Sequence, residues 1–278
     1  MKQYRISFLS FLLLLNSCAA TPVERGLDMT APNPQSMNER AVGDAIHREI
    51  LVSFYPYTDP KVVRYVGDTG RQLAAHAKRK DLEYQFTILY NEKIYATSAP
   101  GGYIYVTTGM LNFLNNEAEL AAILAHEIAE LQYKDPRLSK QEAIFHQVVQ
   151  AGTAIAPLFG PFGSLAALGL VLAEAYNEST HKTPWERLFE SDEAAMGYLL
   201  KTGYDPQALW DVQEHFLRAG EKLAPYFYDY YQSRPVTEAR MVSLKKAFQK
   251  LPLMEKNLIT DPVEYQDVMK GVREIYRA

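Results

Sequence analysis

The chain has 278 residues, of which 47% are hydrophobic and 22% are charged, a balance that suits one large or two modest globular domains. Its formal net charge is -4, and it has no long basic run beyond its first few residues, which argues against a nucleic-acid-binding protein. The single cysteine excludes an internal disulfide.

The N-terminus resembles the signal peptide of a bacterial lipoprotein. A short basic stretch precedes the apolar run Ile6–Leu15, which has the length of a signal peptide and is too short to span a membrane. The sequence Leu15-Asn16-Ser17-Cys18 then resembles a lipobox, in which Asn16 is an unusual residue. Because Cys18 directly follows this segment, we expect it to be acylated. The alternative is an ordinary cleaved signal peptide with an incidental cysteine.

These features divide the chain into three parts. We expect residues 1–17 to be the signal peptide, residues 18–36 to be a flexible tether, and residues 37–278 to form one folded domain. Ala19 follows the cysteine, and a residue other than Asp at that place resembles the lipoproteins that are sorted to the outer membrane. We therefore expect a lipid-anchored protein of the bacterial cell envelope, attached to the outer membrane and facing the periplasm.

Hydrophobic periodicity and turn signals predict two helices, a short β-rich region and further helices. The elements are expected, in chain order, as helices at about 38–54 and 60–80, strands at 82–90, from Lys93 and at 103–106, a helix from Asn116 to about 132, and a helix at 186–202 that ends before the turn Gly203-Tyr204-Asp205-Pro206. This order predicts an α+β fold that is mostly helical and contains a small antiparallel sheet.

The segment 151–176 is strongly apolar, but Pro157, Gly160, Pro161 and Gly163 interrupt it. Its length alone would allow a membrane span, whereas its composition favours a buried or lid-like helical hairpin. Both interpretations stay open at this point.

One motif carries most of the chemical information. The helix predicted from Asn116 contains His126-Glu127, followed at the next turn by Glu130. In the pattern H-E-x-x-H, two histidines on one helix face bind a zinc ion and the intervening glutamate acts as general base on the metal-bound water. Here the first histidine and the glutamate are present, and Glu130 takes the place of the second histidine.

Three segments together resemble the zinc metallopeptidases that include HtpX and the CAAX prenyl proteases, and in particular their periplasmic lipoprotein members. The segments are the run Ser98–Leu111, which contains S-A-P-G-G-Y-I-Y-V-T-T-G-M-L, the run Asn116–Ala129 and the turn at 203–206. The resemblance implies a gluzincin-type active-site helix beside the small sheet, one zinc ion and polypeptide substrates or clients.

The resemblance also implies roles for individual residues. His126 would hold zinc and Glu127 would activate water. The predicted strand at Tyr103–Thr107 would be an exposed sheet edge that takes an extended peptide as an added strand. The expected substrate-binding residues are Gly102, Tyr103, Ile104 and Tyr105.

The chain departs from the family pattern at three places. Glu130 replaces the second histidine ligand, and counting back from Gly203 places Leu188 where the family has its third ligand, a glutamate. Glu190 is then the best substitute ligand. The family also has a late H-P-x-x-x-x-R motif. In this chain the corresponding run begins with Arg234-Pro235 and ends with Arg240, so an arginine takes the place of the histidine. Either arginine could supply a cation to the site and pair with an acidic side chain.

Two functions follow from these residues. The first is a zinc-dependent metalloendopeptidase of envelope proteins, with His126, Glu130 and Glu190 as metal ligands and Glu127 as the catalytic base. The second is a catalytically inactive lipoprotein that keeps the fold as a peptide-binding or chaperone-like module. A different metal ion held by carboxylates is a third interpretation, for which these ligands would be too few without water.

Overall fold

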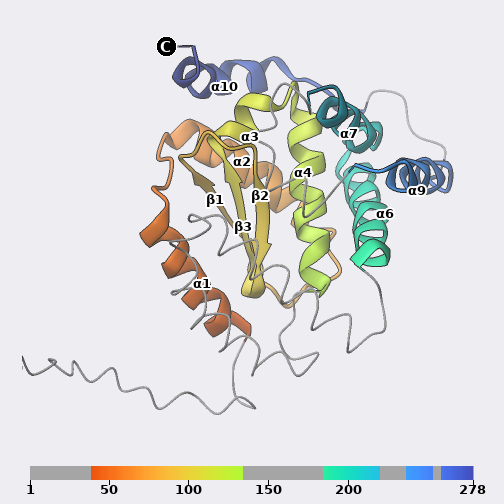
Figure 1. The fold of residues 1–278 in the computed structure, drawn as a ribbon, viewed down its shortest axis with the longest axis horizontal. Coiled ribbons are helices and arrows are strands. Elements are labelled where there is room, and N and C mark those ends of the chain that lie inside the picture. Colours follow the sequence, from red (N-terminus) through yellow and green to blue (C-terminus); the bar gives the residue numbers. More distant parts are fainter. Residues whose placement is uncertain (1–38, 134–183, 220–235, 253–257, 278) are drawn as a thin grey trace, which may run out of the picture. The chain divides into compact units, whose positions relative to one another are not determined.

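The computed structural model describes residues 39–133, 184–219, 236–252 and 258–277 (Figure 1). Within these ranges the protein is mostly helical with one small sheet, which confirms the expected α+β class. None of the described helices is long and apolar enough to cross a membrane. Cys18 and the apolar segment 151–176 lie outside the described residues.

The elements are α1 (Glu39–Ser53), α2 (Pro60–Ala74), β1 (Gln85–Leu89), β2 (Ala96–Ala99), the short 3-10 helix η2 (Pro100–Gly102), β3 (Tyr103–Thr107), α3 (Thr108–Phe113), α4 (Glu117–Glu130), the 3-10 turn η3 (Leu131–Tyr133), α6 (Pro184–Thr202), α7 (Gln207–Ala219), α9 (Glu238–Gln249) and α10 (Val263–Ile275).

The sheet has the order β1–β3–β2, with β1 parallel and β2 antiparallel to the central strand β3. It is therefore mixed, and not antiparallel throughout as the sequence suggested. The chain reverses direction between β1 and β2 and again between β2 and β3, so β1 and β3 run the same way. Since β3 is hydrogen-bonded on both sides and all its residues are buried, the prediction that Tyr103–Thr107 forms an exposed edge is wrong.

Two glycines make the tight connection between β2 and β3 possible. Gly101 and Gly102 have φ angles of 80° and 95°, in the left-handed region that other residues avoid. A Cβ atom on Gly102 would also lie only 2.3 Å from the carbonyl oxygen of Glu83. The glycine pair therefore fixes the place where the chain turns back and inserts β3 into the sheet.

Helix α1 packs against this turn and against β3. Gly43 permits the close approach, because a Cβ atom there would lie 2.0 Å from the carbonyl oxygen of Pro100. The Tyr103 hydroxyl donates to Asp44 Oδ1 at 2.5 Å, and the ring of Tyr103 stacks on His47 with centroids 4.6 Å apart. His47 Nδ1 lies 2.9 Å from the hydroxyl of Tyr105. The two tyrosines predicted to bind substrate therefore contact α1.

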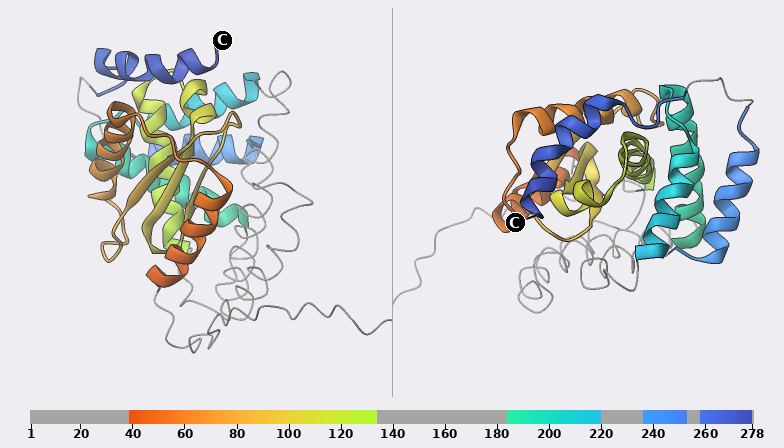
Figure 2. Two further views of the ribbon diagram at one scale, coloured as in Figure 1. Left: turned by 90° about the vertical axis from the view of Figure 1, so that its left-hand side faces the viewer. Right: turned by 90° about the horizontal axis from the view of Figure 1, so that it is seen from above.

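Helix α4 is buried on all sides and lies between the sheet and α6 (Figure 2). Asn116 caps it, because its side chain accepts a hydrogen bond from the backbone N–H of Glu119. All residues from Glu117 to Ala129 are buried, and the run of Ala, Leu and Ile explains why a helix without a polar face is stable here. The buried surroundings hold the H-E-x-x-E motif in one orientation.

The turn after α6 fastens the start of α4. Gly203 has a φ angle of 91° and ends α6, after which the Tyr204 hydroxyl donates to Glu117 Oε1. The hydroxyl of Tyr65 on α2 donates to Glu117 Oε2 at 2.5 Å. Both oxygens of one carboxylate thus join α2, α4 and the Gly203 turn.

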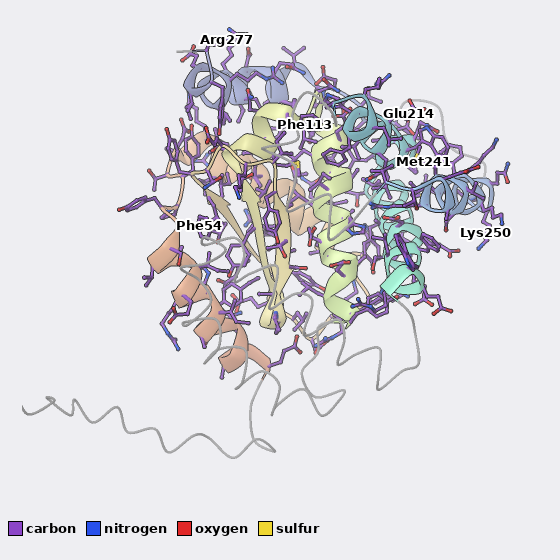
Figure 3. All side chains as sticks on the ribbon, in the orientation of Figure 1. Phe54, Phe113, Glu214, Met241, Lys250 and Arg277 are labelled. Carbon is purple, nitrogen blue, oxygen red and sulfur yellow. The ribbon has the colours of Figure 1, made fainter. Side chains whose placement is uncertain are left out.

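Aromatic stacking joins α3 to α7. Phe113, labelled in Figure 3, stacks on His215 with ring centroids 3.9 Å apart and on Phe216 with centroids 5.1 Å apart. Asn115 Nδ2 lies 3.0 Å from His215 Nδ1. The loop between α3 and α4 is therefore held from α7.

The close approach of α1 gives a testable prediction for stability. Gly43→Ala should lower the free energy of unfolding by about 1–3 kcal/mol, because the new methyl group overlaps the Pro100 carbonyl. Gly197→Ala in α6 is the matched control, since nothing lies within 4 Å of its Cβ position. That change should leave stability unchanged or raise it by about 0.5–1 kcal/mol. Urea unfolding measures both, and equal stability of the two variants would contradict the docking of α1.

Candidate metal centre on helix α4

The geometry of the site begins with His126, which is 1% exposed. Its Nδ1 lies 2.8 Å from Asp192 Oδ1 on α6, although the N–H direction departs from a linear hydrogen bond. The short distance between two buried groups identifies the carboxylate as the partner of Nδ1. When the Nδ1–H group of a histidine donates a hydrogen bond to a carboxylate, the lone pair of Nε2 stays available. Metal-binding histidines have this arrangement.

Asp192 is held in turn by Arg240 on α9. Arg240 Nε donates to Asp192 Oδ2 at 2.8 Å and Nη2 donates to Oδ1 at 2.9 Å, so the contact is bidentate. Both side chains are fully buried. Burial alone would raise the pKa of Asp192, but the Arg240 guanidinium and the contact with His126 outweigh it and hold this pKa below its usual range. The stabilisation is present above the ordinary pKa of about 3.9 and is lost as pH falls through the lower folded value.

Asp192 is the residue of this cluster that the sequence did not single out. It lies four residues after Leu188, a spacing that the sequence shows without indicating a contact with His126. Arg240 was expected to supply a cation to the acidic side chains of the motif, and the structure pairs it with Asp192. Arg234 lies outside the described residues.

The other side of the His126 ring faces Glu130. Nε2 has no hydrogen-bond partner among the described residues and lies 3.7 Å from Glu130 Oε1, one helical turn away. The Glu130 side chain is 18% exposed and so is turned largely into the protein. Two ligand atoms about 2.1 Å from a tetrahedral zinc ion stand roughly 3.4 Å apart, so this separation suits two ligands of one ion.

The remaining ligand position does not fit a catalytic zinc ion. Leu188 lies one helical turn before Asp192 on the same face of α6 and is 5% exposed, and a hydrocarbon side chain cannot bind metal. Glu190, the expected substitute, accepts a hydrogen bond from the Tyr133 hydroxyl at 2.5 Å. Among the described residues no group of three or more His, Cys, Asp or Glu side chains could hold a metal ion. The two ligands that this part of the chain supplies are fewer than the three that catalytic zinc sites use.

Glu127 is fully buried and points to the sheet. Ser98 on β2 donates from its hydroxyl to Glu127 Oε2 at 3.2 Å, which joins the motif helix to the strand beside it. The predicted substrate-binding residues Gly102, Tyr103, Ile104 and Tyr105 belong to the η2 turn and to β3 and are all buried. Contact between these residues and a peptide stays a prediction.

Comparison with known proteins identifies the family. The sequence profile of peptidase family M48 matches residues 60–248, which cover most of the described site. The β-barrel assembly-enhancing protease of Yersinia pestis is 27% identical over 175 residues, which are 62% of this chain and 36% of that protein. The protein of the same name from Escherichia coli K12 is 25% identical over 183 residues, which are 64% of this chain and 37% of that protein.

The chain therefore belongs to peptidase family M48, a family of zinc metallopeptidases. It spans little more than a third of the length of these relatives. Helix α1 and helix α10 lie outside the matched region, and α4, α6 and most of α9 lie within it.

Proposed function

Starting from membership of family M48, we propose that this chain acts on polypeptides of the bacterial cell envelope, which it binds at the α4 site without cleaving them by itself. The observation that carries the proposal is Leu188, which occupies the ligand position one turn before Asp192. Family membership and the names of the relatives, which are proteases linked to β-barrel assembly, support a polypeptide as the bound molecule.

The family's framework is kept at the site, while the ligand set that residues 39–133 and 184–219 supply is incomplete. His126 remains oriented by Asp192, and Glu127 remains fixed by Ser98. Metal-dependent hydrolysis needs an ion held tightly enough to make its bound water acidic, and an ion with two protein ligands is not so held. Burial of the Leu188 side chain contributes about 1.5–3 kcal/mol to stability, so the loss of the ligand leaves the fold intact.

A second candidate function is metal-dependent endopeptidase activity on the same substrates. One observation favours it: the His126 Nε2 and Glu130 Oε1 atoms have a separation that suits one zinc ion, and Glu127 follows His126 directly. In that case a further ligand has to come from outside the described residues. His126 and Glu130 as ligands and Glu127 as base belong to this candidate, and Glu190 would join them only by giving up its hydrogen bond with Tyr133.

The sequence also supports a location for the protein. We propose attachment to the outer membrane through acylated Cys18, with the domain in the periplasm, because Cys18 follows an apolar run of signal-peptide length. Cys18→Ser should move the protein from the membrane fraction to the unattached envelope fraction on cell fractionation. Continued membrane retention of that variant would contradict attachment by acylation.

Restoring the missing ligands tests the proposed function. The variant Glu130→His with Leu188→Glu should bind one zinc ion tightly and gain cleavage of an unfolded envelope protein, because three protein ligands and a water complete the catalytic arrangement. The natural protein should bind the same polypeptide without cleaving it. Competition with a chelator measures zinc affinity, and electrophoresis of the polypeptide measures cleavage.

The control is Leu188→Glu with Glu130→His and Glu127→Gln, which should bind zinc and remain inactive. Tight zinc binding by the natural protein, together with cleavage that Glu127→Gln abolishes, would contradict the proposal and establish the second candidate. Failure of the natural protein to bind unfolded envelope polypeptides would contradict both.

A further inference from the structure

The connection between α1 and α2 carries an exposed apolar surface that the site on α4 does not use. Residues 50–58 include no charged side chain. Val52 in the last turn of α1 and Tyr55 just beyond it are each 83% exposed, whereas Ile50 and Phe54, which Figure 3 labels, belong to the core. Exposed connections are ordinarily polar, so this composition points to a contact that covers the surface.

Pairing with β1 places three tyrosine rings on one face of this connection. Tyr90 donates its backbone N–H to the carbonyl oxygen of Tyr55 at 2.8 Å, and Pro56 lies opposite Leu89 in an antiparallel bridge. Side chains alternate along an extended chain, and residues opposite each other share a face. Tyr55, Tyr57 and Tyr90 therefore lie on the same face, and the last two rings stack with centroids 6.4 Å apart. These three side chains form the tyrosine patch.

The outer edge of the connection does not suit a further strand. The backbone N–H of Tyr57 and the carbonyl oxygen of Tyr55 are both bonded to the β1 side. The residue between them therefore turns its backbone groups outward, and this residue is Pro56, which has no N–H to donate. Proline at such a place protects a sheet edge from pairing with another chain. The side chains of the patch, and not its backbone, are thus what this surface offers.

Exposed tyrosine rings suit the boundary between water and lipid. The ring is apolar and the hydroxyl is polar, so tyrosine is enriched at the level of the lipid headgroups. Tyr90 is 51% exposed and Tyr55 is 83% exposed, so both rings are available for such a contact. A stable protein interface buries about 800 Å² on each partner and uses twenty or more residues a side. The patch is smaller than that, which favours a lipid surface over a protein partner.

The proposed anchor lies within reach of this surface. Residues 19–38 separate Cys18 from Glu39, where α1 begins. A flexible chain of that length has a mean end-to-end distance of about 25 Å and extends to about 70 Å at most. Helix α1 has 15 residues, so its two ends are about 22 Å apart. The connection at the far end of α1 can therefore reach the membrane that holds Cys18.

We propose that the tyrosine patch rests on the membrane to which Cys18 is attached, so that lipid covers the rings of Tyr55 and Tyr90. This inference rests on the proposed attachment, and it goes beyond it by naming the side of the domain that faces the lipid. A few side chains bind a bilayer only weakly, but the anchor keeps them at a high local concentration beside it. Loss of the anchor therefore still releases the protein.

The experiment places a fluorescent dye beside the patch in the acylated full-length protein. Cys18 is the only cysteine, and acylation consumes its thiol, so Ser53→Cys adds the one reactive thiol. Ser53 is exposed and lies between Val52 and the patch. The labelled protein is incorporated into vesicles of phosphatidylethanolamine with a minor share of phosphatidylglycerol. Nitroxide groups on the lipid acyl chains should then remove most of the emission of the dye.

A dye at Glu193→Cys is the control for position. Glu193 lies on α6, is exposed and pairs with Lys250 of α9. In the same vesicles this dye should keep its emission in the presence of nitroxide lipids and should be quenched by iodide in the water.

Two sets of substitutions test the side chains of the patch. Tyr55→Ser with Tyr90→Ser should restore the emission of the dye at position 53, and both rings are exposed enough for the variant to keep its fold. Val242→Ser on α9 removes an apolar side chain that is 45% exposed on another element, and it should leave the quenching unchanged.

The outcomes separate this inference from the attachment on which it rests. Acylated protein in vesicles whose dye at position 53 is not quenched by nitroxide lipids would overturn the docking and leave the anchor in place. Protection of that dye from iodide without quenching by the lipids would also overturn it, because a protein surface would then cover the patch. A Cys18 peptide without lipid, measured by mass spectrometry, would overturn the attachment and the docking together.

Discussion

The buried ion pair between Asp192 and Arg240 is the interaction on which the rest of the site depends. It joins α6 to α9, and the same carboxylate reaches α4 through His126. A buried carboxylate without its arginine would leave an uncompensated charge, which costs several kcal/mol in proteins. The bidentate contact therefore holds the three helices in one arrangement and fixes the orientation of the His126 ring.

Further hydrogen bonds hold the motif helix around this histidine. Ser98 joins Glu127 to the strand beside α4, and the Glu117 carboxylate joins the start of α4 to α2 and to the Gly203 turn. These contacts hold the motif helix in place. In the proposed function Leu188 stands where the family resemblance implies a ligand, and its side chain is buried in the fold.

The sequence predicted the features that depend on local patterns and missed those that depend on distant pairing. The motif helix followed from the Asn116 cap and the apolar run, and the helix before Gly203 was expected at nearly the place where α6 lies. Strand pairing could not be predicted in the same way. Alternation of side chains along β3 indicates which residues share a face of the sheet, but not which strands lie beside it. The insertion of β3 between β1 and β2 turned an expected edge into a central strand. The partner of Arg240 was hidden for the same reason, since 48 residues separate it from Asp192.

The central claim is that Asp192 holds the proton of His126 on Nδ1 and leaves Nε2 bare beside Glu130. Nitrogen NMR of the chain with labelled histidine rings, recorded with a chelator present, tests this directly, and the spectrum of His126→Gln assigns the signals. The account predicts that the nitrogen facing Asp192, Nδ1, carries a proton, and that this preference is lost in Asp192→Asn. A preference for the proton on Nε2, with none on Nδ1, would contradict the pairing of His126 with Asp192.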